Sequence, residues 1–331
     1  MKPTLFPDLI GQEVAKRKLA FFLDGYRASH YVPHLMFVAP KGCGKTMMAK
    51  ATAKELTSRD EPKAKPFLEL NCSTIKNVPQ FFNQVVIPHM NQQECTVLFD
   101  EASELPKDVT MALLTILNPN KDNRTTFSFE DYTVDFDFTR QSFMFATTEA
   151  QSIFHALMDR CERLDLEEYT HDELGKIVAV NYPDGEFEDG LLGKIATVLR
   201  GNARQAQKMA NNIRAYLASK GRTKFTAADW NALKYALGIL PLGLSRIELQ
   251  VLRILHASKE CSLTNIAAKT GLTPECLRRD FEMYLQKHSL MEITTNGRSI
   301  TPRGQEYLKD LDASTRKSTP VKIKLPKVTT K

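Results

Sequence analysis

Residues 39–46 constrain the fold more than any other part of the chain. They have the sequence Ala-Pro-Lys-Gly-Cys-Gly-Lys-Thr and follow directly on the apolar run 35–38. A short apolar run that ends in a glycine-containing loop predicts a buried strand feeding a turn, and the helix formers of residues 47–56 predict a helix after it. A strand, a glycine-rich loop and a helix N-terminus bind phosphate together, because backbone N–H groups converge on the anion and the helix dipole favours negative charge.

The residue types in this loop point to a nucleotide. Gly42 and Gly44 are expected where a Cβ would obstruct the chain around the phosphate. Lys45 would reach the β- and γ-phosphates, and Thr46 would hold Mg²⁺ through its hydroxyl. Ala39 stands where the strict pattern has glycine, and because alanine is small we expect nucleotide binding to survive. The alternative is an ordinary glycine-bearing turn between a strand and a helix.

A second apolar strand, residues 96–101, ends in Asp100 and Glu101. A buried strand carries two carboxylates at its end only where polar or cationic groups meet them. Beside a phosphate loop, Asp100 would join the Mg²⁺ shell and Glu101 would polarise the attacking water. Alternatively, the two acids start the helix expected over residues 107–117.

Two further side chains are candidates for contact with the nucleotide. Ile10 lies in an apolar loop upstream of the phosphate loop, where it would wall the adenine or pack on the sheet edge. The core strand 142–148 ends in two hydroxyls, and we expect Thr148, with Thr147 as second choice, to sense the γ-phosphate. The alternative is that both are ordinary strand threonines.

Two arginines are candidates for phosphate contact from outside the loop. Arg160 precedes the last core strand, as an arginine finger for a neighbouring subunit's γ-phosphate would. Its alternative is a surface salt bridge with Asp159 or Glu162. Arg204 opens a helix and would touch a phosphate across a cleft.

The remaining elements follow from hydrophobic periodicity. We expect a strand at 66–71, a final core strand in the segment that runs to Leu166, and a β-hairpin at 125–138. Helices are expected at 13–26, 73–86, 172–180, 187–199, 203–219, 227–237, 245–256, 263–270 and 274–287. The four helices between 172 and 237 predict a small helical lid.

The last three helices and the alternating segment 291–300 predict a winged helix. Asn296-Gly297 is a signal for a type I′ turn in a hairpin. The third helix, residues 274–287, is the candidate recognition helix. Arg278 and Arg279 on this helix and Arg298 at the wing tip would contact DNA phosphates. Winged helices also dock proteins, which is the alternative here.

Composition describes an ordinary protein with a basic tail. A chain of 331 residues, 42% hydrophobic and 25% charged, predicts two or three domains. We find no signal peptide and no apolar run near membrane-spanning length, so we do not expect the chain to insert into a membrane. The six cysteines show no C-x-x-C pair, and we expect them to be reduced thiols. The net charge of +6 equals the lysines and arginines after Ala313, which have no acid among them. We expect residues 312–331 to be disordered and to attract nucleic acid or aid solubility.

Six motifs occur in an order that resembles the AAA+ ATPases. They are Ile10-Gly-Gln12, Gly44-Lys-Thr46, Phe99-Asp-Glu101, Ala146-Thr-Thr148, Asp159-Arg160 and Gly201-Asn-Ala-Arg204. Residues 242–252 and 301–304 are similar to the RuvB family of Holliday-junction branch-migration motors, so that the resemblance covers roughly residues 5–311.

The resemblance implies an α/β fold: an AAA+ P-loop ATPase domain (1–168), a helical lid (169–240), a C-terminal winged-helix DNA-binding domain (241–311) and a basic tail (312–331). It implies that Asp100 and Glu101 are the Walker B pair, Thr148 sensor 1, Arg160 the trans-acting finger and Arg204 sensor 2, with Ile10 by the adenine. ATP and Mg²⁺ are the implied cofactors. A homo-oligomeric ring, expected to be a hexamer, would work on duplex or branched DNA in the cytoplasm of a bacterial or phage-infected cell, associated with the nucleoid.

Some features depart from the RuvB pattern. The hairpin at 125–138 has a short acidic tip instead of a longer apolar one, which leaves open whether the partner is RuvA-like or another DNA-loading protein. Asp159-Arg160-Cys161 is close to the Ser-Arg-Cys of sliding-clamp loaders. The leading hypothesis is an ATP-driven DNA translocase, and the alternative is a clamp-loader-like or initiator-like ATPase. A non-catalytic DNA-binding scaffold is disfavoured by the intact loop and paired acids.

Overall fold

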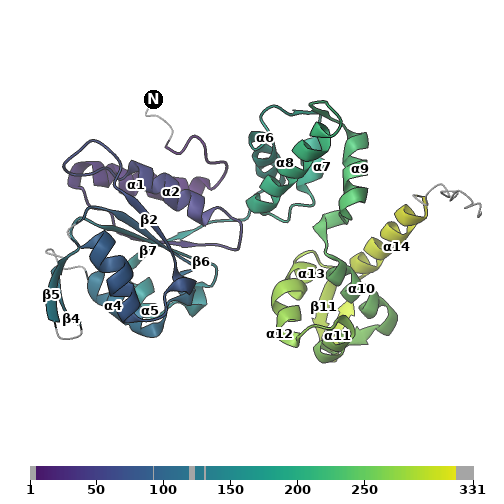
Figure 1. Ribbon diagram of the computed structural model, residues 1–331. Coiled ribbons are helices and arrows are strands. Elements are labelled where there is room, and N and C mark those ends of the chain that lie inside the picture. The colour runs from purple at the N-terminus through teal and green to yellow at the C-terminus, as the bar shows by residue number, and fades with distance from the viewer. Residues whose placement is uncertain (1–4, 92, 119–123, 130–131, 318–331) are drawn as a thin grey trace, which may run out of the picture. The chain divides into compact units, whose positions relative to one another are not determined.

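The computed structural model describes residues 5–91, 93–118, 124–129 and 132–317 (Figure 1). Contacts divide the chain into two compact units, residues 1–227 and 228–331. Helix α9 (Ala227–Leu237), predicted from the sequence to belong to the lid, groups with the second unit. In the described part of the chain no single helix is long and apolar enough to cross a membrane, and one bent helix pair passes that test only when its two helices are combined.

The first unit is built on a five-stranded parallel sheet in the order β2-β3-β6-β1-β7. Its strands are β1 (His34–Val38), β2 (Phe67–Asn71), β3 (Thr96–Asp100), β6 (Ser142–Thr147) and β7 (Cys161–Asp165). In this register Asp100 lies opposite Ala146, and Val38 lies opposite Thr147. The carboxyl ends of the three central strands therefore meet at one edge, where ligands bind in open α/β sheets.

Alternation along each strand builds a core on both faces of the sheet. On β6, Phe143 and Phe145 face one cluster, while Met144 and Ala146 face the other. Helices cover both faces, with α1 (Glu13–Ser29) and α2 (Lys45–Glu55) on one and α4 (Lys107–Ile116) and α5 (His155–Met158) on the other (Figure 1). Every residue of β6 is buried, so the strand that carries Thr147 and leads into Thr148 lies in the centre of the core.

The helix expected over residues 73–86 is not a single α-helix. In place of one helix over 73–86 there is a 3-10 turn, η1 (Cys72–Thr74), a short helix, α3 (Val78–Phe81), and a π-helical segment, η2 (Phe82–Met90). Helix α3 starts late because the Asn77 side chain accepts a hydrogen bond from Gln80 N at 2.9 Å, which fixes the N-cap there.

The lid corresponds to α6 (His171–Val180), α7 (Leu191–Ala196) and α8 (Ala203–Ala218), with a small parallel pair, β8 (Glu186–Phe187) and β9 (Lys224–Phe225). The prediction of a helix over 187–199 was therefore wrong in its first turn. Gly190 has a φ of 70° and ends the extended segment before α7, so that the helix cannot begin earlier.

As expected, β4 (Arg124–Phe129) and β5 (Tyr132–Asp137) form an antiparallel β-hairpin, which extends from the core of the first unit (Figure 1). Its predicted acidic tip, residues 130–131, lies outside the described residues. At its base, Phe136 and Phe138 are buried in the core.

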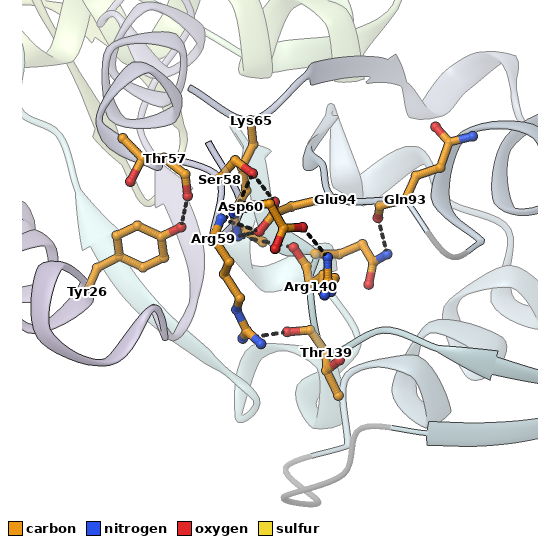
Figure 2. A network of polar contacts seen from close by, with 12 residues as sticks. Tyr26, Thr57, Ser58, Arg59, Asp60, Lys65, Gln93, Glu94, Thr139 and Arg140 are labelled. Atoms are coloured by element: carbon orange, nitrogen blue, oxygen red, sulfur yellow. Dashed lines mark hydrogen bonds and ion pairs between the residues drawn. The ribbon is translucent and has the colours of Figure 1, made fainter. Parts of the chain in front are cut away.

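A polar network fixes the chain where it leaves the hairpin (Figure 2). The buried Lys65 Nζ donates to the Arg140 carbonyl at 3.0 Å and lies 3.9 Å from the Glu94 carboxylate. Glu94 also accepts from Arg59 N at 3.1 Å, and Arg59 Nη2 donates to the Thr139 carbonyl at 3.1 Å. Because a buried charge must be paired and hydrogen-bonded, these contacts tie the hairpin base to the core.

The second unit contains a winged helix. After α9 come η5 (Pro241–Gly243), α10 (Arg246–Ser258), α11 (Leu263–Thr270), α12 (Pro274–Leu277), the π-helical η6 (Arg278–Glu282), α13 (Met283–Lys287) and α14 (Pro302–Lys317). The wing is a three-stranded sheet in the order β10-β12-β11, formed by β10 (Glu260–Cys261), β11 (Met291–Thr294) and β12 (Gly297–Ile300). The sequence predicted the two longer strands but missed β10.

The wing turn differs from the predicted type I′ turn. Thr294 pairs with Gly297, so the turn residues are Thr295 and Asn296, and neither has the positive φ that type I′ requires. Gly297 is needed for another reason: a Cβ there would lie 2.6 Å from the Cys261 carbonyl oxygen. The close approach of β10 therefore requires the glycine.

The predicted start of the disordered tail at residue 312 was too early. Helix α14 continues to Lys317, and residues 318–331 lie outside the described part of the chain. Thr301 Oγ1 accepts from Gly304 N at 3.1 Å and caps this helix, and Leu308 is buried in the core of the unit.

Candidate functional site

The candidate site is a pocket of about 270 Å³ in the first unit, at the carboxyl ends of the central strands. It brings together most of the residues predicted to bind or hydrolyse a nucleotide. Its lining residues are Lys41, Gly42, Gly44, Lys45, Thr46, Met47, Asp100, Glu101, Thr147, Thr148, Ala203, Arg204 and Gln207.

The phosphate loop has the backbone that its glycines predicted. Gly42 and Gly44 have φ values of 83° and 91°, and α2 begins at Lys45. Lys45 Nζ donates to the carbonyls of Ala39 and Pro40, at 2.7 and 3.1 Å. Burial lowers the pKa of Lys45, an effect opposed by the Cys43 thiol and the Asp100 carboxylate. A partly desolvated cation in a loop of backbone donors is suited to an incoming phosphate.

Thr46 and Asp100 place two oxygen ligands side by side. Thr46 Oγ1 donates to Asp100 Oδ2 at 2.9 Å, and Asp100 Oδ1 accepts from Glu101 N at 3.0 Å. Mg²⁺ in nucleotide sites takes one or two protein oxygens and completes its shell with phosphates and water. These two residues fit such an ion.

Glu101 lies just past the end of β3 in a conformation that is unusual for a side-chain-bearing residue. Its φ is 59°, in the left-handed region that costs roughly 1–2 kcal/mol for such a residue. The side chain is exposed at the pocket. The alternative interpretation, in which the two acids start α4, is wrong. The N-cap residue of that helix is Pro106, and no side chain caps the helix through a hydrogen bond at that position.

The two threonines at the end of β6 differ in their surroundings. Thr147 is fully buried, and its Oγ1 accepts from Glu149 N at 3.0 Å. Thr148 is partly exposed and, like Thr147, lines the pocket. The arrangement leaves the hydroxyl of Thr148 the better placed of the two for a ligand.

Arg204 lies at the start of α8 and lines the pocket, so the cleft between the phosphate loop and the lid is the one that the sequence predicted. Its positive charge also lowers the pKa of Lys45, behind the larger effect of burial. Three cations, Lys41, Lys45 and Arg204, therefore line the same pocket as the two carboxylates, an arrangement that suits a polyphosphate bound together with a metal ion.

Arg160 and Ile10 do not line this pocket. Arg160 Nη1 donates to the Ala156 carbonyl at 2.9 Å, and its Nε is buried and makes no hydrogen bond to the described residues. The alternative interpretation, a salt bridge with Asp159 or Glu162, does not hold among the described residues: Asp159 pairs with His155 at 2.8 Å and Glu162 with Lys18 at 3.0 Å. Roles in a neighbouring subunit for Arg160 and at the adenine for Ile10 stay predictions.

Sequence reasoning missed two residues at the phosphate loop. A Cβ on Gly44 would lie 2.6 Å from the Tyr169 hydroxyl, so this tyrosine packs directly on the loop. A single aromatic residue in a connecting segment has no periodicity that marks it. Asn202 also contacts the loop, and its position just before α8 was a recognisable N-cap signal.

In the second unit, Arg278 and Arg279 are exposed on η6, between the two halves of the recognition helix. Arg279 Nε donates to the neighbouring Asp280 at 3.0 Å. The placement of Arg298 at the wing tip was wrong. It lies within β12, where its Nε donates to the buried Glu282 carboxylate at 2.5 Å and its Nη2 at 3.3 Å. Its guanidinium thus joins the wing to the recognition helix.

Comparisons with known proteins agree with this arrangement. Residues 35–169 match the family model "ATPase family associated with various cellular activities (AAA)", and residues 241–309 match the model "RuvB C-terminal winged helix domain". The chain is similar to the Holliday junction branch migration complex subunit RuvB of Campylobacter hominis, at 27% identity over 319 residues, covering 93% of this chain and 90% of the relative. The corresponding RuvB of Sulfurimonas denitrificans is 24% identical over 328 residues, with the same two coverages.

A solved structure, the Thermotoga maritima RuvB Holliday junction branch migration motor, matches with a TM-score of 0.74 and 22% identity, covering 93% of this chain and 98% of that one. At this identity the likeness concerns the fold. The phosphate loop, the paired acids and the two matched models lead to one conclusion: the chain contains an AAA ATPase domain over residues 35–169 and a RuvB-type winged helix over residues 241–309, and it resembles RuvB across both.

Proposed function

We propose that the chain is an ATP-driven DNA motor of the RuvB type, which translocates duplex DNA to migrate Holliday junctions or other branched DNA. The observation that carries the proposal is the pocket that joins Lys45, Thr46, Asp100 and Glu101, in a chain that also carries a RuvB-type winged helix. Its curated relatives are named as subunits of a Holliday junction branch migration complex.

In this proposal each pocket residue has one task in ATP hydrolysis. The loop amides and Lys45 bind the β- and γ-phosphates, and Arg204 approaches the γ-phosphate from the lid. Thr46 and Asp100 would hold Mg²⁺, which neutralises charge on the phosphates when bound. Glu101 orients the attacking water, and Thr148 contacts the γ-phosphate that this water attacks.

The finer parts of the proposal concern assembly and partners. We infer a homo-oligomeric ring, with six subunits as the expected number, in which Arg160 of one subunit completes the pocket of the next. The ring would act on duplex or branched DNA, and the winged helix would touch phosphates through Arg278 and, more weakly, Arg279. A RuvA-like or other DNA-loading protein would bring it to the junction.

A direct test is the rate of ATP turnover without DNA and with single-stranded, linear duplex and four-way-junction DNA. Glu101→Gln is the matched control, since it keeps the size of the side chain and removes the carboxylate. We expect turnover in the unmodified protein to rise with duplex or junction DNA and to be lost in the variant. Turnover that ignores DNA and rises only with an added protein would instead favour a loader, to which the Asp159-Arg160-Cys161 sequence is similar.

A further inference from the structure

The lid is joined to the phosphate loop by two hydrogen bonds. Asn202 Nδ2 donates to the Lys41 carbonyl at 3.0 Å, and Ala203 N donates to the Gly42 carbonyl at 3.0 Å. The contact is close, because a Cβ on Gly42 would lie 2.0 Å from Asn202 Oδ1. Gly42 is therefore needed for the approach of the lid as well as for its own positive φ.

The Asn202 side chain serves both the lid helix and the loop. Its Oδ1 accepts from Arg204 N at 2.9 Å and from Gln205 N at 3.2 Å, which makes it the N-cap of α8. Its Nδ2 binds the phosphate loop. A single amide group thus connects the first turn of α8, where Arg204 lies, to the loop that receives the phosphates.

The two bonds fix more than the two carbonyl groups. A peptide group is planar and trans, so the direction of a carbonyl also sets the direction of the N–H in the same plane. Holding the carbonyls of Lys41 and Gly42 therefore orients the N–H groups of Gly42 and Cys43. Backbone N–H groups of such loops are the donors that cradle phosphate.

We propose that Asn202 is a positioning residue for the nucleotide: its side chain holds the phosphate-loop peptide at Lys41 in a fixed position relative to Arg204, beside the backbone bond from Ala203 to Gly42. This inference rests on the proposed ATPase function of the same pocket. It predicts that Asn202 contributes to nucleotide affinity without touching the nucleotide, through the loop that it orients.

The test is the affinity for ADP of Asn202→Asp and Asn202→Ser, measured by titration of a fluorescent ADP analogue. Asp and Ser are N-caps of about the same quality as Asn, so α8 stays capped, while both variants lose the amide donor to Lys41. We expect each variant to bind ADP about fivefold to tenfold more weakly, because a loop released from one hydrogen bond must be ordered again when the nucleotide binds. The melting temperature of the nucleotide-free protein should stay close to that of the unmodified chain.

The matched control is Asn77→Asp. Asn77 caps α3 through Gln80 N, does not line the pocket and should leave ADP affinity unchanged. Weakening by Asn202→Asp alone, with Asn202→Ser unaffected, would assign the effect to the added charge and overturn the proposal. Unchanged affinity in both variants would also overturn it. ADP binding needs neither hydrolysis nor DNA, so this result is separate from success or failure of the motor proposal.

Discussion

At the scale of single residues, the pocket side chains already make bonds that a nucleotide would replace. Lys45 donates to carbonyls of its own loop, and the Thr46 hydroxyl donates to Asp100. Phosphate and Mg²⁺ would take over both contacts, so little rearrangement of these side chains is required. The spacing of glycine, lysine and threonine in the chain was enough to predict these positions, because the loop is a local structure.

Other residues of the site could not be predicted from the sequence, because their roles depend on contacts across the fold. Tyr169 and Asn202 reach the phosphate loop from segments more than a hundred positions away in sequence. The partner of Arg298 was equally hidden. Glu282 lies on the recognition helix, and only the packing of the wing brings the two charges together.

His34 gives the stability of the first unit a pH dependence. Burial lowers the pKa of His34 to about 4 from an ordinary value of 6.5, and its ring lies 5.6 Å from that of Phe143. Between these two values the unfolded chain binds a proton that the folded chain does not, so stability falls as the pH is lowered from 6.5 towards 4. The full loss is up to about 3 kcal/mol.

The measurement is the free energy of unfolding by denaturant at several pH values, for the unmodified chain and for His34→Phe. The variant lacks the titrating ring and should lose less stability than the unmodified chain as the pH falls. Parallel losses in the two proteins would show that His34 is not responsible.

At the scale of elements, short apolar runs predicted most of the parallel core strands well, and alternation predicted β2. Buried strands such as 142–148 combine a short apolar run with clear boundaries, and the structure has β6 at Ser142–Thr147. The π-helical segment Phe82–Met90 and the short strand β10 were missed. Their shapes depend on packing and on a third-strand pairing, neither of which leaves a regular pattern in a single sequence.

In the winged helix, the exposed pair Arg278 and Arg279 and Arg298, which pairs with a buried carboxylate, should respond differently to substitution. Arg278→Ala combined with Arg279→Ala should weaken DNA binding and reduce its salt dependence, by about one unit of slope for each lost phosphate contact. Arg298→Ala should instead destabilise the unit by about 3 kcal/mol, since the buried Glu282 would lose its partner.

Thermal unfolding and DNA titrations at several salt concentrations separate these effects. Replacing both partners, with Arg298→Met and Glu282→Gln, should restore much of the stability lost in the single variant. If the Arg298→Ala protein had normal stability and its DNA binding depended less on salt, Arg298 would instead be a residue that contacts DNA. An unchanged slope after loss of Arg278 and Arg279 would favour a protein-docking role for this helix.

At the scale of the whole molecule, the order of the motifs predicted the sequence of domains, while the boundaries needed the structure. Helix α9 groups with the second unit, and α14 extends past the predicted start of the tail. The second difference arises because α14 continues through a change in composition, which a sequence pattern marks as a boundary, and the first because the contacts that group α9 with one unit leave no pattern in the sequence.

Arg160 tests the assembly of subunits. Arg160→Ala should lower ATP turnover about a thousandfold or more, the scale of a lost arginine finger, while leaving ATP binding largely intact. Because the finger acts in a neighbouring subunit, mixing this variant with Glu101→Gln should restore part of the turnover: the second variant supplies Arg160 to a pocket with an intact Glu101. A mixture no more active than either variant alone would argue against action between subunits.

We propose that ATP hydrolysis in this chain moves a DNA junction. The most direct measurement is the conversion of a labelled mobile four-way junction into duplex products with ATP and Mg²⁺, with an immobile junction and the Glu101→Gln variant as controls. We predict ATP-dependent conversion of the mobile junction by the unmodified protein alone or with its loading partner, and none with the variant. Junction-stimulated turnover without conversion of the mobile junction under either condition would contradict the claim.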